Sequence, residues 1–248
     1  MSFNQLDVKD IVLTYKKIYE NACELIEEAE ILFIHQKYAR AFLCAHISIE
    51  EFGKLPMLTS VALNIYNGVK IDWKELNKRI RNHKKKTSSS QSIQMIMEKV
   101  LFDFEYENIE EKITSIDDTE KEKYYDLNKF KDFLASIDFY KLKKDSLLNA
   151  LLDNPRLHED YAIRTAVADL LNDYKNHSLY SDFYKEEFKK PSEVIDRKRC
   201  MRRIMMALFQ KKFNDFINIQ NRGFALYKYE DIGFDQIIAK IKKRINEK

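Results

Sequence analysis

Hydrophobic residues recur at steps of three and four along most of the chain, which is the spacing of one face of a helix. The first stripe runs through residues 11–33 and consists of Ile, Val, Leu, Tyr, Phe and Ala. Asp7 stands in front of it, where a carboxylate can accept hydrogen bonds from the first free backbone N–H groups of a helix. The pattern predicts a helix from Asp7 to about His35.

A short polar break at residues 35–37 separates this stripe from a second one. We expect the second helix to continue past Pro56 to about Tyr66, with a kink allowed at the proline because it lacks a backbone donor. Asn67-Gly68 is a strong stop signal, since glycine readily takes the left-handed conformation that ends a helix. Two long helices joined by so short a break predict an antiparallel hairpin.

The rest of the chain shows the same helical spacing, with breaks between the stretches. Further helical or apolar periodic stretches start at Asp72 and occupy residues 92–104, 124–152, 158–176, 192–219 and 232–245. Residues 105–123 are acidic and polar, which indicates an exposed loop or a poorly packed insertion, and residues 177–191 are expected to form a loop. The sequence therefore predicts an all-α fold: a single helical bundle over residues 1–248, built on the long antiparallel hairpin, with an inserted helical segment at about 92–153.

Composition agrees with a helical protein, because the 248 residues include only 4 Gly and 3 Pro. The formal net charge of +3 is small for this length, so charge alone does not indicate a dedicated nucleic-acid binder. The three Cys are far apart and show no CxxC spacing, which argues against a disulfide framework or a zinc ribbon. We see no signal-peptide pattern and no run of about 18 apolar residues, and therefore expect a cytoplasmic protein without a membrane partner.

The second predicted helix carries a stripe of small residues. Ala41, Ala45, Ser48 and Phe52 follow one another at steps of three and four, so they share one face. Small side chains on that face would let another helix approach closely.

A neighbouring stripe of the same helix is ionisable. His46, Glu50 and Lys54 recur at steps of four and are expected to stack in one column, with Glu51 beside Glu50. Such groups in an apolar helix need solvent or partners. They could form a buried cluster whose shifted pKa values suit acid–base chemistry, or a buried ion network that fixes the register of the helices.

Residues 38–55 follow the string YARAxxxAxxxIEExGKL, which resembles the signature helix of the AbiV family of bacterial abortive-infection (anti-phage) proteins. That family is usually placed near the HEPN group of all-helical toxins and RNA-cutting domains. The resemblance implies a HEPN-like protein that arrests the infected cell by blocking translation after activation by a phage-encoded protein. It also implies RNA or the translation machinery as a partner, and a homodimer formed through the helical hairpin.

HEPN nucleases resemble one another in an Arg-x(4–6)-His motif, and Arg40 and His46 match its spacing. In that motif the His acts as base or acid in RNA cleavage, while the Arg steadies the charge of the phosphate. By this resemblance His46 or His83 is the candidate acid–base group, Arg40 or the block 84–86 binds phosphate, and Glu50 and Glu51 orient the others. The alternative interpretation of His46 is a histidine on a packed face.

Residues 78–86 form the most basic block of the chain. Within it, the string Asn82-His83-Lys84-Lys85-Lys86 resembles an "sHxxK" element that follows the signature helix in AbiV-like proteins, with His83 and Lys86 as the matching positions. Lys84 and Lys86 could contact RNA phosphates, or the cations could cap a solvated helix end. If the protein cleaves RNA, this block should face the polar column.

Lys175, Tyr180 and Asp182, followed by a proline, resemble the "R/K…LYVD…P" element of the family, with Ser181 where we expect Val. Tyr180 and Asp182 are expected on a loop from which they could reach the polar column. Alternatively, the tyrosine is buried and closes the bundle. By resemblance, Lys54 and Lys175 join these two residues as candidate binding residues.

The sequence contains no HExxH, EF-hand loop, paired ExxH or P-loop, and we predict neither a metal nor another cofactor. The first function hypothesis is a phage-defence protein that arrests the infected cell, whose enzymatic form would be a metal-independent endoribonuclease. The alternative is a non-catalytic helical module that binds a phage or host protein. A weaker third hypothesis is a di-metal or cofactor-binding bundle enzyme.

Overall fold

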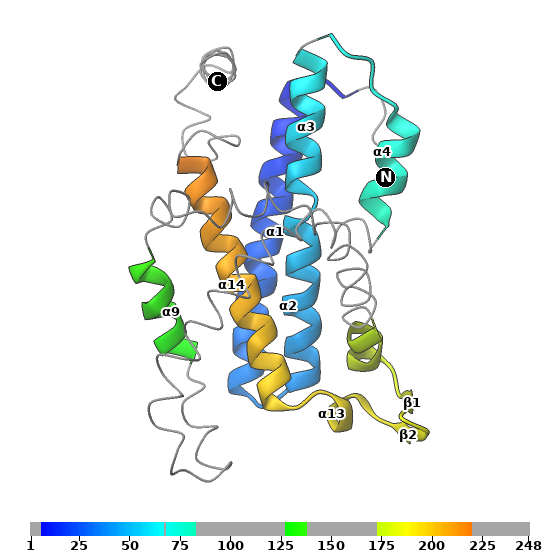
Figure 1. Ribbon diagram of the computed structural model, residues 1–248, viewed down its shortest axis with the longest axis vertical. Helices are drawn as coiled ribbons and strands as arrows, with labels where there is room; N and C mark the ends of the chain where they lie inside the picture. The colour runs from blue at the N-terminus through cyan, green and yellow to red at the C-terminus, as the bar shows by residue number, and fades with distance from the viewer. Residues whose placement is uncertain (1–5, 67, 83–126, 138–172, 220–248) are drawn as a thin grey trace, which may run out of the picture.

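The computed structural model describes residues 6–66, 68–82, 127–137 and 173–219. Three long helices lie side by side in it: α1 (Val8–Ile34), α2 (Tyr38–Phe52) and α14 (Arg197–Ile219) (Figure 1). α3 (Leu55–Tyr66) follows α2 and packs on α1, while α9 (Leu127–Ser136) packs on α14. The protein is all-α, as its sequence predicts.

The predicted hairpin is formed by α1 and α2. Asp7 caps α1 by accepting a 2.7 Å hydrogen bond from the backbone N–H of Asp10, and the helix ends at Ile34. The small-residue stripe of α2 faces α1: Ala41, Ala45 and Ser48 are fully buried. The Ser48 hydroxyl donates to the backbone oxygen of Ala22, across the interface, at 2.7 Å. The prediction that small residues permit a close helix contact is confirmed.

The second predicted helix is broken, but not at its proline. α2 ends at Phe52, Gly53 is its C-cap, and α3 starts at Leu55. Pro56 is therefore the second residue of α3, where a helix has no acceptor for a backbone N–H and proline is tolerated. The correct boundary lies just before the proline, and the expected continuous helix is wrong at this point.

The C-terminal helix also begins later than expected. A single turn, α13 (Pro191–Val194), comes first, and α14 starts only at Arg197. Asp196 caps α14, since its Oδ1 accepts the backbone N–H of Arg199 at 2.7 Å. Ser192, which we expected to cap the long helix, lies inside α13 instead.

The expected loop at 177–191 is wrong as well. Helix continues from residue 173 to residue 179, and a two-stranded antiparallel sheet follows: β1 (Asp182–Tyr184) and β2 (Glu187–Lys189). The turn between the strands consists of Lys185 and Glu186, whose φ angles are 51° and 68°. Neither residue is the Gly or Asn that usually occupies such a turn, so the sequence held no turn signal.

The remaining described elements are shorter. α4 (Trp73–Arg81) is capped by Asp72, as predicted, through a 2.9 Å hydrogen bond from the Glu75 backbone N–H. α9 lies within the predicted middle segment, and its Phe130 and Leu134 are buried. The other residues of 92–153 and the final predicted helix lie outside the described residues. Within the described ranges, no helix is both long and apolar enough to cross a membrane.

Candidate functional site

Four charged or titratable side chains meet where α2, α14 and the helical residues 173–179 come together. Arg203 of α14 places its Nη2 2.7 Å from the Nδ1 of His46. His46 Nε2 lies 3.3 Å from Glu50 Oε1, and the Nζ of Lys175 lies 3.5 Å from the same oxygen. We call His46, Glu50, Lys175 and Arg203 the buried cluster.

Three of the four members of the buried cluster are shielded from water, whereas Lys175 is partly exposed. His46 is 1% exposed, Glu50 2% and Arg203 2%. Phe42 closes one side, because its ring stacks on His46 at 6.1 Å between centroids and lies under the Arg203 guanidinium at 5.9 Å. A cation over an aromatic face is favourable, and more so when both are desolvated. His46, Glu50 and Arg203 are therefore part of the core.

The hydrogen bonds fix the protonation of His46. Burial lowers the pKa of His46 to about 3, and the charges of Arg203 and Lys175 act in the same direction, against Glu50. The imidazole is therefore neutral near pH 7. A guanidinium only donates, so Nδ1 accepts from Arg203, and Nε2 carries the proton and faces the Glu50 carboxylate.

This arrangement limits what the cluster can do chemically. A general base needs a free nitrogen within reach of the proton that it removes. Both nitrogens of His46 are engaged, and the side chain is almost entirely out of solvent. In this conformation the cluster joins three segments of the chain, which fits the register-fixing interpretation.

The predicted column of His46, Glu50 and Lys54 is only partly present. His46 and Glu50 stack as expected, but Lys54 forms an ion pair with Glu51 instead. The physical reason is that α2 ends at Phe52, so the position four residues after Glu50 no longer belongs to the same helix. Lys175, singled out by resemblance, takes the place beside Glu50.

Arg40 and His46 do not share a site. Two residues that are six positions apart on an α-helix point in directions that differ by about 120° around the helix axis. The two side chains therefore lie on different faces of α2. His46 is buried, whereas Arg40 is exposed and its Nη1 lies 3.5 Å from the backbone oxygen of Leu179. The spacing of the nuclease motif is present, but the two side chains do not converge.

Tyr180 and Asp182 lie outside the buried cluster. Tyr180 is 63% exposed, so it does not close the bundle. Asp182 is exposed at the start of β1, where its Oδ1 accepts the backbone N–H of Phe183 at 2.7 Å. Neither of the two expectations for this pair describes the structure.

The basic block is described only in part. Lys78, Arg79 and Arg81 are exposed in the last turn of α4. His83, Lys84 and Lys86 lie outside the described residues, so the expectation that they face the polar column stays a prediction.

Arg203 is the residue that sequence reasoning missed. It lies on a helix whose surrounding positions are apolar and buried: Cys200, Met201, Ile204, Met205, Met206 and Ala207. An arginine inside such a run must find a buried acceptor, because an unpaired buried charge is very costly. That conflict was visible in the sequence and could have identified it.

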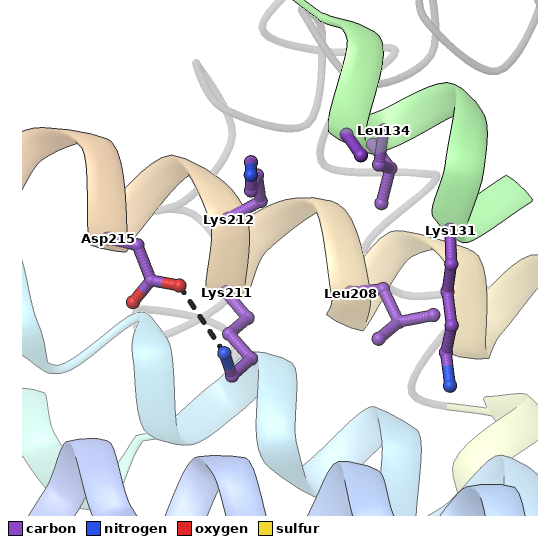
Figure 2. Close-up of a pocket in the computed structure, with 7 residues that line it drawn as sticks. Lys131, Leu134, Leu208, Lys211, Lys212 and Asp215 are labelled. Carbon is purple, nitrogen blue, oxygen red and sulfur yellow. Dashed lines mark hydrogen bonds and ion pairs between the residues drawn. The ribbon is translucent and has the colours of Figure 1, made fainter.

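A second candidate is an open groove between α9 and α14 (Figure 2). It is lined by Lys131, Leu134, Ala135, Leu208, Lys211, Lys212 and Asp215. Lys211 lies 3.3 Å from Asp215, and Lys131 lies 2.7 Å from Glu30, so two of its lysines already have carboxylate partners. The groove therefore offers no converging set of charges to a ligand.

Among the described residues, no group of three or more His, Cys, Asp or Glu side chains is arranged to hold a metal ion. The absence of a metal or other cofactor stays a prediction, because much of the chain lies outside those residues.

Fold and site together define the class: an all-helical bundle whose long helices are joined by a buried ionic cluster. The family model of AbiV, a HEPN-type family, matches residues 11–207, so the chain belongs to the AbiV family. The match includes all four residues of the buried cluster. Membership assigns the protein to abortive infection, a form of anti-phage defence. No curated protein and no solved structure matches the chain.

Proposed function

We propose that this AbiV-family protein arrests the infected cell by binding, with the translation machinery as its target, after activation by a phage-encoded protein. The buried cluster acts as a structural lock in this proposal and not as a catalytic centre. The observation that carries it is His46, which is 1% exposed and has both ring nitrogens engaged.

Surface charge supports a target that contains RNA. One face of α4 carries three exposed cations at steps of four and three residues: Lys74, Lys78 and Arg81. The buried residues of that helix, Leu76 and Ile80, lie on the opposite side. Exposed cations of this kind contact phosphates without reading sequence.

The test separates binding from cleavage. Wild type, His46→Asn and His83→Ala are produced in a bacterial host under phage challenge, and phage yield, incorporation of labelled amino acids and integrity of total RNA are measured. We expect His46→Asn, once circular dichroism shows it folded, to retain protection, reduced translation and intact RNA.

A ribonuclease gives a different result. If wild type fragments RNA in cells and as purified protein, and a folded histidine variant does neither, the binding proposal is wrong. The variant that loses cleavage would then identify the catalytic histidine.

A further inference from the structure

Large apolar side chains are exposed together at one end of the bundle. The last turn of α1, the start of α2, the β1–β2 hairpin and the start of α14 all lie at this end (Figure 1). We call residues 31–40 and 179–199 the hairpin end. Of the eight large hydrophobic side chains exposed in the described ranges, six belong to it: Ile31, Ile34, Leu179, Tyr180, Phe183 and Phe188. Patches of exposed apolar side chains mark protein or membrane interaction sites.

Hydrogen bonds hold the hairpin end against the bundle. Arg40, in the first turn of α2, donates from its Nη1 to the backbone oxygen of Leu179 at 3.5 Å. The hydroxyls of Tyr174 and Tyr184 lie 3.3 Å apart, which joins the hairpin to the helical residues 173–179. The exposed side chains of the hairpin and of α2 therefore belong to one connected surface.

The outer face of the hairpin carries only apolar side chains. Phe183 and Phe188 pair across the strands with ring centroids 5.5 Å apart, and they are 67% and 66% exposed. Successive residues of a strand point to opposite faces, so the charged strand residues lie on the other face: Asp182, Glu187 and Lys189. The two phenyl rings therefore project from the protein with no charge on their own face of the strands.

The turn of the hairpin is strained, and aromatic contacts fix it in place. Lys185 and Glu186 both occupy the left-handed region, which residues with a side chain adopt at a cost. The Tyr184 ring beside the turn has the Lys185 Nζ 5.6 Å from its centroid and the His177 ring 5.2 Å away. Strained backbone that the surrounding structure holds in place occurs preferentially at functional positions.

The hairpin end also carries the net positive charge of the chain. It contains eight Lys and Arg residues against five Asp and Glu, an excess of three, which equals the net charge of +3 of all 248 residues. The rest of the chain is therefore neutral in sum. Several of these cations are exposed next to the apolar side chains: Lys37, Arg40, Lys185, Lys190, Lys198 and Arg199.

Three of the five carboxylates at this end are engaged by groups of the protein itself. Glu187 lies 2.8 Å from Lys189, and Asp196 lies 2.5 Å from Arg199. Glu193 accepts the backbone N–H of residue 190 at 2.8 Å. The positive charge of the hairpin end is therefore balanced only in part.

The places of the apolar and charged groups favour a lipid surface over a nucleic acid. The hairpin itself, residues 182–190, has three lysines and three carboxylates, so it brings no net charge to a phosphate backbone. A bilayer offers a separate place to each kind of group. Aromatic rings enter the boundary between headgroups and acyl chains, while Lys and Arg side chains reach the headgroup phosphates.

We propose that the hairpin end binds the surface of a membrane that contains anionic lipid. Phe183, Phe188 and Tyr180 enter the boundary between headgroups and acyl chains, and the surrounding cations contact lipid phosphates. The sequence led us to expect no membrane partner because it contains no segment that could span a bilayer. A contact with the surface needs no such segment.

The contact should be weak and reversible. An aromatic side chain buries about 150–250 Å², so three rings supply an apolar anchor too small to hold the protein alone. Attraction between the cations and anionic headgroups must add to it, and salt screens that attraction. Binding should therefore require anionic lipid and weaken as the salt concentration rises.

The first experiment measures co-sedimentation of the full-length protein with vesicles. Wild type should bind vesicles of phosphatidylglycerol mixed with phosphatidylcholine, and bind phosphatidylcholine alone much less. Phe183→Ser/Phe188→Ser should weaken binding at least about tenfold, because it removes two large apolar groups from an exposed face. Leu13→Ser/Val69→Ser is the matched control, since both residues are exposed and lie outside the hairpin end. It should bind as wild type does.

A charge reversal tests the electrostatic part. Lys37→Glu/Lys190→Glu should weaken binding to the anionic vesicles at least about tenfold and reduce its dependence on salt. Lys9→Glu/Lys17→Glu makes the same change of charge at two exposed positions in the N-terminal half of α1. This control should retain most of the binding, although the net charge of the two variants is identical.

A fluorescence measurement shows whether the hairpin enters the bilayer. Trp73 of α4 is the single tryptophan of the chain and lies outside the hairpin end. In Trp73→Phe/Phe188→Trp the indole replaces a phenyl of the hairpin, so its emission should shift to the blue with vesicles and be quenched by brominated acyl chains. Emission of Trp73 in wild type should respond to neither.

Three results would overturn the proposal: a wild type that ignores anionic vesicles, binding that survives Phe183→Ser/Phe188→Ser, or an equal loss in the control variants. If that serine variant instead loses binding to an RNA oligonucleotide while wild type ignores vesicles, the hairpin end is a nucleic-acid site. The vesicle assay contains neither phage nor ribosomes, so none of these results bears on whether the protein arrests translation.

Discussion

At the scale of single residues, His46 shows how burial decides the role of a histidine. Its ring is neutral, its Nδ1 accepts from Arg203, and its protonated nitrogen faces Glu50. A histidine in water would titrate near neutral pH and exchange protons freely. In the folded protein the low pKa keeps the imidazole neutral down to acidic pH. Acid should therefore lower the stability of the fold before it protonates His46 in the folded state.

His46 should make the folded protein sensitive to acid. Its pKa is 6.5 when unfolded and about 3 when folded, so between these values the unfolded state binds more protons. Stability is therefore fully present above pH 6.5 and falls as the pH decreases toward 3, by about 1.4 kcal/mol per pH unit. Urea unfolding at pH 7.5 and 5.0 should show wild type losing about 2 kcal/mol more than His46→Asn. Equal losses in both proteins would contradict the assigned pKa.

The sequence predicted some of these residues and not others, for a physical reason. The step of four residues places His46 next to Glu50 on any helix, and the structure has them together. The same rule failed for Lys54, because it holds only inside one helix. Spacing says nothing about a contact with Arg203, which is 157 residues away.

At the scale of the elements, local signals located some helix boundaries well and others poorly. Asp7 and Asp72 cap their helices where the sequence placed them. The break before α3 was missed, since we expected one helix to continue past Pro56 with a kink allowed there; proline is harmful inside a helix but harmless in its first turn. The β1–β2 hairpin was missed because Lys185-Glu186 is not a turn sequence, and strands of three residues show little periodicity.

The close contact between α1 and α2 should not tolerate a larger side chain. Ala45 is fully buried where α2 faces α1, so Ala45→Leu must push the helices apart or distort its own rotamer. We expect a loss of about 1–3 kcal/mol in the free energy of unfolding, measured by urea denaturation. Arg40→Leu introduces the same side chain on the exposed face of α2 and should change stability much less. A stable Ala45→Leu protein would mean that the interface is loosely packed.

At the scale of the whole molecule, polar contacts join the two ends of the described chain. Arg203 contacts His46, which lies 157 residues earlier in the sequence. The Tyr19 hydroxyl donates a hydrogen bond to Asp215, which lies 196 residues later. The hydrophobic pattern predicts a bundle, but it does not say which helix lies beside which. The packing of α14 against α2 includes a hydrogen bond between Arg203 and His46, and no local sequence pattern predicts this contact.

Glu50 should be the most sensitive member of the buried cluster. Glu50→Gln keeps the size of the side chain but leaves Arg203 and Lys175 beside a neutral histidine. Removing one partner of a buried charge pair costs about 3–5 kcal/mol, and thermal or urea unfolding should show a loss of this size. The double variant Glu50→Gln/Arg203→Met also removes one of the two cations that Glu50→Gln leaves without a carboxylate in the cluster. It should therefore be more stable than Glu50→Gln alone. Simple addition of the two single effects would show that the residues are not coupled.

The position of Arg203 late in the sequence has a consequence for synthesis. The ribosome makes His46 157 residues before Arg203, which at about 5–20 residues per second is a delay of roughly 8–30 s. During that time the imidazole and carboxylate of α2 have no partner on α14 and must stay hydrated, so the growing chain cannot close its core. A chain released early therefore remains open to proteases, and an interruption of protein synthesis stops the supply of folded copies of this protein itself.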